Sequence, residues 1–351
     1  MTTNIACYNI DFGIVEADVR ANPEAFISNA EYLSLAQLTS PEDFCSTLAT
    51  ITGLPISVGA SASDIKFAFL EALKARYVDL LPHAEGAAED FLLFIKVRYF
   101  INNAFILLSA AMKSRTLSTG VRLHPLGEFV NLEHLTEIEN FSEVFATLLE
   151  VSPAGPYFLQ AGMDPDTFRI EDVTPLEFEQ LKAKTEARYL EDFHRFCLRL
   201  GGLTAEVMNE ILTFEADQMT TMIALNTLGN DDISPDVRME MMPKLGNLYP
   251  YLQERLLQVG DMEGIRSILS EMFELKQVLD HQANDSTLTL LDAFAAESVT
   301  VLRNAFREQF CFGAIYAYFR LKEIETSNVI WMYECLLGQR YAEMRKYVQI
   351  F

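Results

Sequence analysis

The sequence is poor in basic residues: 27 lysines and arginines stand against 50 aspartates and glutamates, and the formal net charge at pH 7 is −23. Proteins that bind nucleic acid need a basic footprint for the phosphates, so this composition argues against that class. It also argues against direct adsorption on anionic lipid. Two interpretations of the acidic balance stay open, a basic protein partner and an ordinary acidic surface. Half of the 351 residues are apolar, which is enough for a sizeable core.

Long apolar runs and a cysteine framework are also missing. The longest apolar candidates, Ala104–Met112 and Phe310–Phe319, are far shorter than the roughly 18 residues that span a bilayer. No basic region followed by an apolar segment marks a secretory signal near Met1. We therefore expect reduced, mainly buried cysteines, although one bridge between distant cysteines stays open. The five are Cys7, Cys45, Cys197, Cys311 and Cys335.

The common catalytic motifs are absent as well. The chain contains no Gly-x-x-x-x-Gly-Lys-Ser/Thr, Gly-x-Ser-x-Gly or His-Glu-x-x-His. Asp164-x-Asp166 begins like a calcium loop, but Arg169 stands where that loop needs glycine. His124, before Pro125, could be a ligand or a base, and a histidine that caps a turn is the favoured interpretation. We expect no catalytic residue, no cofactor site and no metal site.

The sequence does contain clear signals for the starts and ends of helices. Ser40-Pro41-Glu42-Asp43 combines a hydroxyl cap, proline at the first helical position and acids in the first turn. Thr174-Pro175-Leu176-Glu177 repeats this pattern and predicts a long helix that ends at Gly201-Gly202. Strand-like alternation is scarce. The sequence therefore predicts an all-α fold.

A weak internal repeat predicts three related helical units. A pattern that starts at Tyr32 recurs 97 residues later at Phe129 and again, at a further offset of 124, around Leu256. Helical spacing alone can produce such similar patterns, but three copies about one hundred residues apart favour related units. Loop signals at 118–120 and 228–235 then give three lobes, 1–119, 120–234 and 235–351, which we expect to be arranged about a pseudo-threefold axis.

The C-terminal segment from Glu308 reads as two helices that meet near Lys322. Two acids, Glu323 and Glu325, lie close to the only tryptophan, Trp331. A carboxylate beside a buried helix needs a partner or a water-lined cavity. Trp331 itself fits either a core position or a contact at a binding surface.

A second acid pair, Glu215 and Asp217, has the same i, i+2 spacing as Glu323 and Glu325. On a helix such residues point about 200° apart, so neither pair forms an acid/base dyad. Ion pairs between lobes are the favoured role. A polar lining for a central opening and contact with a partner remain the alternatives.

Motifs distributed along almost the whole chain resemble the eukaryotic V-type ATPase subunit d family. They occur in the family order and are Tyr8-Asn9-x-Asp11-x-Gly13, His124-Pro125-Leu126-Gly127-x-Phe129, Phe196-Cys197-x-x-Leu200-Gly201-Gly202-x-Thr204-Ala205, Phe214-Glu215-Ala216-Asp217, Gly246-x-Leu248-Tyr249-Pro250, Lys322-Glu323-x-Glu325-x-x-Asn328-Val329-Ile330-Trp331-x-x-Glu334-Cys335 and Tyr347-x-x-Ile350-Phe351.

The resemblance implies a funnel-shaped, three-lobed helical protein with a central opening. It also implies a non-catalytic subunit that sits on the proteolipid c-ring, receives central-stalk subunits D and F, and turns with them. Such a subunit lies on the cytosolic face of acidified organelle membranes through its partners, without spanning. The residues expected at partner interfaces or in coupling are Glu323, Glu325, Asn328, Trp331, Glu215, Asp217, His124 and Phe351.

Some positions depart from the family pattern. Gln218-Met219 replaces two basic residues, Ser327 replaces an arginine and Gln349 replaces a proline. These departures weaken the expectation that the ion pairs of this chain follow the family pattern. Two other classes stay open: a helical adaptor that kept the fold outside the pump, and a helical enzyme that uses an acidic cavity.

Overall fold

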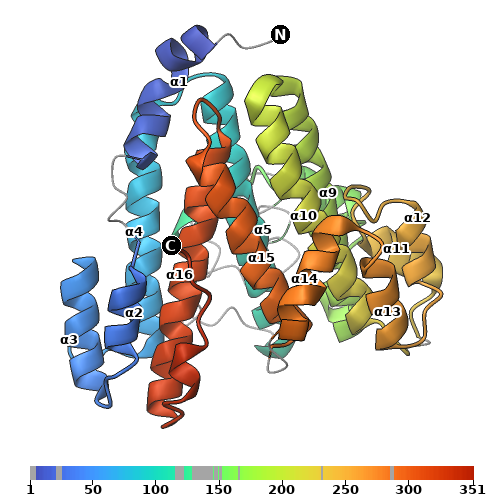
Figure 1. Cartoon of the computed structure of the whole chain (residues 1–351). Helices are drawn as coiled ribbons and strands as arrows, with labels where there is room; N and C mark the ends of the chain where they lie inside the picture. The colour runs from blue at the N-terminus through green and yellow to red at the C-terminus, as the bar shows by residue number, and fades with distance from the viewer. Residues whose placement is uncertain are drawn as a thin grey trace. The chain divides into compact units, whose positions relative to one another are not determined.

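The computed structural model describes residues 5–20, 26–114, 122–128, 145, 149, 152–164, 167–230, 232–284 and 288–351. Within these ranges every regular element is a helix, and no strand is present (Figure 1). The predicted all-α fold is confirmed. The predicted loop at 118–120 lies outside the described residues.

The chain divides into two compact units, each built from separate stretches of sequence. Unit 1 comprises residues 1–92, 200–208 and 295–351, and unit 2 comprises 93–199 and 209–294. Unit 1 therefore joins the two ends of the chain. The arrangement of three lobes about an axis stays a prediction.

Unit 1 contains the N-terminal helices and the C-terminal helix. Its elements are α1 (Ile5–Arg20), α2 (Asn29–Leu35), α3 (Pro41–Thr52), α4 (Ala62–Leu80), η2 (Leu81–His83), α16 (Gly313–Leu337) and η5 (Glu343–Arg345), with the first part of α5 (Ala87–Ser114), the first part of α10 (Gly202–Asn226) and most of α15 (Leu290–Arg307).

Unit 2 contains the rest of α5, α10 and α15 together with the central helices. These are η3 (Pro125–Gly127), α8 (Gly155–Gln160), η4 (Ile170–Asp172), α9 (Pro175–Leu200), α11 (Pro235–Met241), α12 (Tyr251–Leu256), α13 (Met262–Leu269) and α14 (Phe273–Asn284).

The predicted helix starts are confirmed at atomic level. The Ser40 hydroxyl accepts the Asp43 N–H at 3.3 Å at the start of α3. Thr174 and Glu177 form a reciprocal capping box at the start of α9, in which the Glu177 carboxylate accepts the Thr174 N–H at 2.8 Å. Helix α9 ends at Leu200, immediately before the glycine pair, as expected.

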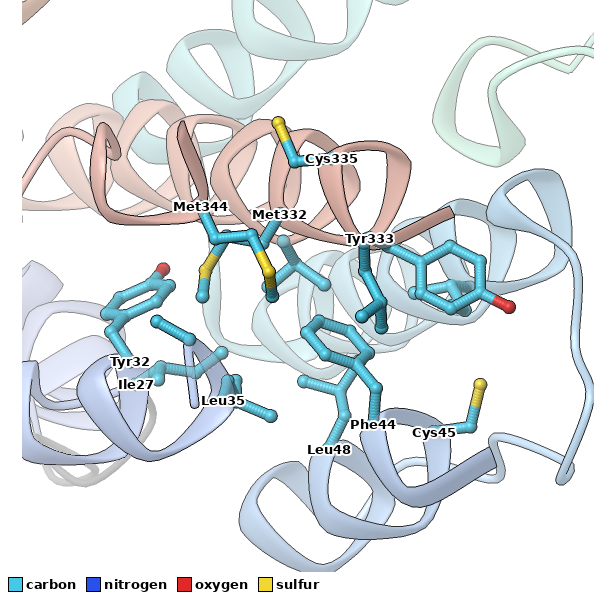
Figure 2. Close-up of a cluster of buried hydrophobic side chains, with 14 of the residues drawn as sticks. Ile27, Tyr32, Leu35, Phe44, Cys45, Leu48, Met332, Tyr333, Cys335 and Met344 are labelled. Atoms are coloured by element: carbon cyan, nitrogen blue, oxygen red, sulfur yellow. The ribbon is translucent and has the colours of Figure 1, made fainter. Parts of the chain in front are cut away.

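The core of unit 1 is shared by the two ends of the chain. In Figure 1 the blue helices α2, α3 and α4 lie beside the red helix α16. Phe44 and Leu48 of α3 are fully buried, and the Phe44 ring lies 5.4 Å from that of Tyr333 on α16. Met332 and Met344 fill the space between α16 and the α2 residues Tyr32 and Leu35 (Figure 2). The N-terminal helices of this unit therefore depend on residues almost 300 positions later for their apolar partners.

The predicted helix break near Lys322 is wrong, because α16 runs without interruption from Gly313 to Leu337. Lys322 pairs with Glu325 and Arg320 pairs with Glu323, each three residues apart on the helix surface. Such pairs support a continuous helix. The break comes earlier, between the end of α15 at Arg307 and Gly313.

Helix α5 is the most apolar long helix described. Among the described residues, its stretch Ala87–Ala110 is long and apolar enough to cross a membrane by length and composition. Because 67% of this apolar stretch is buried inside the protein, we interpret it as a core helix. Four cysteine side chains are described, and all are free and buried: Cys45, Cys197, Cys311 and Cys335.

Candidate functional site: polar anchors on long helices

Asp217 on α10 binds the loop that leads from α11 to α12. Its carboxylate is fully buried and accepts the backbone N–H groups of Asn247 at 3.0 Å and Leu248 at 2.9 Å. Gly246 has φ +99°, and a Cβ there would stand 2.3 Å from Asp217 Oδ1. The two motifs that contain Asp217 and Gly246 are therefore the two halves of one contact, and the second half requires glycine.

Burial raises the pKa of Asp217 to about 6, and the bonds from Leu248 and Asn247 oppose that rise. The nearby carboxylate of Glu274 adds to it. A buried carboxylate that is bonded by backbone N–H groups and the Asn247 side chain of one loop fits a structural anchor for that loop.

The neighbouring acid, Glu215, has a different environment. It accepts a hydrogen bond from Arg98 of α5 at 3.1 Å, and its side chain is 13% exposed. Glu215 thus connects α10 to α5 inside unit 2, while Asp217 holds a loop.

Glu325 is the corresponding buried acid on α16. One oxygen accepts the Ile27 N–H at 2.6 Å, and the other lies 2.5 Å from the Lys322 ammonium. Burial raises the pKa of Glu325, while Lys322 and the Ile27 N–H oppose the rise. The Lys322 ammonium also lies 4.6 Å from the centre of the Phe26 ring, a cation–π contact. Glu325 therefore joins the segment before α2 to α16.

Glu323 points to a more exposed part of the same helix. It pairs with Arg320, and the two side chains are 22% and 21% exposed. Glu325, two residues later, is fully buried, so the i, i+2 spacing places the two acids in separate environments.

Asn328 on α16 and Asn103 on α5 make the same contact in different units. The Asn328 amide donates to the Val348 carbonyl at 2.7 Å and accepts the Val348 N–H at 3.0 Å. The Asn103 amide bonds the carbonyl and N–H of His124 at 2.9 and 2.8 Å. Both asparagines hold the backbone of one residue about twenty positions later. Asn103 was missing from the predicted site residues, although its position echoes that of Asn328.

His124 caps a turn, as the favoured interpretation had it. Its Nδ1 accepts the Leu126 N–H at 3.2 Å, and its ring stacks on Tyr99 with 4.1 Å between centroids. Gly127 packs so tightly on α5 that a Cβ would stand 2.3 Å from the Tyr99 carbonyl oxygen. The His-Pro-Leu-Gly motif therefore fixes residues 124–127 on α5.

Trp331 and Phe351 lie at the edge of the core of unit 1. The Trp331 ring is partly buried against the core, its indole N–H donates to the Glu343 carbonyl at 3.3 Å, and Arg340 lies over it at 5.3 Å. The Phe351 ring is 39% exposed and packs against Phe26 at 5.2 Å.

The structure does not gather the eight predicted residues into one cluster. Five lie in unit 1 and three, Glu215, Asp217 and His124, lie in unit 2. Among the described residues, no group of three or more histidines, cysteines or acids could hold a metal ion.

Three of the buried anchors recur at a regular interval. Asn103, Asp217 and Asn328 lie on the long helices α5, α10 and α16, and each binds backbone groups of a later segment. Their separations are 114 residues (103 to 217) and 111 residues (217 to 328). This spacing is close to the predicted lobe length.

Comparison with known proteins gives a consistent picture. A model of the ATP synthase (C/AC39) subunit family matches residues 15–347. V-type proton ATPase subunit d of Dictyostelium discoideum is 29% identical over 349 residues, which cover 98% of this chain and 96% of the relative. The protein of the same name from Saccharomyces cerevisiae is 28% identical and covers 98% and 99%. V-type proton ATPase subunit d2 of Arabidopsis thaliana is 28% identical and covers 94% and 93%. Because the family model spans nearly the whole sequence, this chain belongs to the ATP synthase (C/AC39) subunit family.

Proposed function

We propose that this chain is the d subunit of a V-type proton-transporting ATPase and that it works as a mechanical coupler. In this role it sits on the cytosolic face of the proteolipid c-ring and receives central-stalk subunits D and F. ATP hydrolysis elsewhere in the complex would then turn the ring and acidify an organelle such as a vacuole, lysosome or endosome. The observation that carries the proposal is the family match over residues 15–347.

The polar anchors support a mechanical role. A part that transmits torque has to keep its loops fixed on its helices under load. Asn103, Asp217, Glu325 and Asn328 each bind backbone groups of a distant segment, and three of these side chains are fully buried. Hydrogen bonds shielded from water in this way are costly to break, because the freed groups would be left unpaired.

The same anchors argue for a subunit without chemistry of its own. Asp217 and Glu325, the two most buried acids among the described residues, are engaged with backbone N–H groups rather than directed at a shared reaction centre. In this proposal the isolated chain hydrolyses no ATP and needs no cofactor.

The regular spacing of the anchors supports three related lobes. If α5, α10 and α16 are equivalent helices of lobes 1–119, 120–234 and 235–351, a pseudo-threefold arrangement would surround a central opening for the stalk. The acidic charge of −23 suits contact with basic partner surfaces there.

Affinity purification of the tagged chain from membranes tests this function. We expect proteolipid subunits and central-stalk subunits to co-purify in constant ratio. Recovery of the chain free of all pump subunits would instead favour the adaptor role outside the pump. ATP turnover that tracks the purified chain itself would contradict a non-catalytic role.

A further inference from the structure

Residues 338–351 form a C-terminal strap that runs back along α16. Asn328 holds the strap through both backbone groups of Val348, and the Trp331 indole donates to the Glu343 carbonyl. Met344 and Ile350 of the strap are buried, with exposures of 0% and 1%. The strap is therefore fastened to α16 at two places by three hydrogen bonds.

The strap also holds α2, and its contacts there are mostly aromatic. The Tyr347 ring stacks on Tyr32 with 4.5 Å between centroids and 21° between planes, and its hydroxyl lies 2.5 Å from Asn29 Oδ1. Phe351 packs against Phe26 just before α2. Figure 2 shows Met344 between Met332 of α16 and Tyr32. Residues 26–36 and the strap thus stabilise each other directly.

Beneath the start of α2 the packing is incomplete. A partly open cavity of about 240 Å³ lies beside Phe26, Ile27 and Glu31 and is also lined by residues of α4 and α16. Lys322, the partner of Glu325, lines this cavity. Helix α2 has only seven residues, and so short a helix depends on tertiary contacts for its stability. These features single out α2 as a part of unit 1 that can separate locally.

We propose that residues 26–36 and the C-terminal strap form one lid, which opens as a unit and uncovers the Lys322–Glu325 ion pair. Opening breaks the Ile27 N–H bond to Glu325 and the Tyr347 contacts together, while α16 keeps its own hydrogen bonds and its contacts with α3 and α4. The open form exposes the Glu325 carboxylate, which is fully buried in the closed form, and it uncovers more of Lys322, which is 17% exposed there. This lid does not depend on the proposed role in the pump.

Hydrogen exchange of the full chain tests the lid, with a matched pair of variants. Asn328→Ala removes the strap clamp, and Asn103→Ala removes the same clamp chemistry from unit 2. We expect Asn328→Ala to raise amide exchange at least tenfold in both 26–36 and 338–351, with α9 unchanged. Asn103→Ala should leave residues 26–36 at their original rate. If Asn328→Ala does not fold, Tyr347→Phe, which loses only the hydroxyl contact with Asn29, should give a smaller rise in the same two segments.

Acylation of lysine amines gives a second readout. Lys322 should react at least tenfold faster in Asn328→Ala, measured against exposed Lys276 of α14 in unit 2 as an internal reference. Faster exchange confined to the strap would overturn the proposal, because α2 would then stay in place while the strap opens. A uniform rise across unit 1 would overturn it too, since the whole unit would be opening.

Discussion

Helices α10 and α16 each carry two acids with i, i+2 spacing, and the two pairs divide their roles alike. In both pairs the first acid, Glu215 or Glu323, is partly buried and forms an ion pair with an arginine. The second acid, Asp217 or Glu325, is fully buried and accepts backbone N–H groups of a distant segment. The i, i+2 spacing itself explains this, because it directs one acid inward and the other toward a flank of the helix.

The pairs differ in what balances the buried charge. Glu325 has the Lys322 ammonium at 2.5 Å, whereas the hydrogen bonds of Asp217 come from the N–H groups of Asn247 and Leu248. Loss of Glu325 would therefore leave the partly buried Lys322 ammonium without its carboxylate, and loss of Asp217 would leave neutral amides. The comparison teaches that two acids of equal burial need not have equal energetic weight.

The largest effect is expected for Glu325→Leu. Removing the buried partner of an ion pair costs about 3–5 kcal/mol, because the Lys322 ammonium loses its carboxylate and the buried Ile27 N–H loses its acceptor. Urea unfolding should show a matching loss in the free energy of unfolding. The double variant Lys322→Met/Glu325→Leu should recover much of it. If the single and double variants are equally unstable, the lysine does not carry the difference between the two helices.

The charge of Asp217 should make stability depend on pH. Its pKa is about 6 in the folded chain against an ordinary value of 3.8, so the folded state binds this proton first. Stability from this group therefore increases as pH falls from 7 through 6 and levels off near 3.8, by on the order of 3 kcal/mol. Asp217→Asn should lose this contribution. The difference between the two unfolding curves isolates it from all other carboxylates, and an unchanged difference across pH 4–7 would contradict it.

A smaller loss is expected when the loop contact of Asp217 is crowded. Gly246→Ala places a Cβ at a positive φ and against Asp217 Oδ1, and we expect a cost of about 2 kcal/mol. Gly229→Ala is the matched control, since its φ is +70° and a Cβ there meets nothing within 4 Å. Equal melting temperatures for the two variants would show that Asp217 does not restrict Gly246.

Local sequence signals predicted much of the fold but little of the site. Caps such as Ser40 and Thr174 act over three or four residues, so they can be read directly from the sequence. The bond between Glu325 and Ile27 joins positions 298 residues apart, and no local pattern indicates it. The error at Lys322 has a different origin: the charges in an apolar segment suggest a helix end, although their partners lie one turn away on the same helix. Asn103 and Asn328 share a role that no local pattern indicates, because it depends on the backbone groups of His124 and Val348 that they hold.

The smallest change in stability is expected for Glu323→Ala, and that makes it the sharpest test of coupling. Glu323 is 22% exposed and pairs with Arg320, which is equally accessible, so its loss should cost only about 0.5 kcal/mol. The measurement is paired: thermal melting of the isolated chain, and ATP hydrolysis against proton pumping in the assembled complex. Near-normal melting with hydrolysis retained and pumping reduced is the result that a coupling role requires. A large drop in melting temperature with poor assembly would make Glu323 a structural residue like Glu325. If melting, hydrolysis and pumping all stay normal, Glu323 is a solvated charge on the helix, and the functional contact of α16 lies elsewhere.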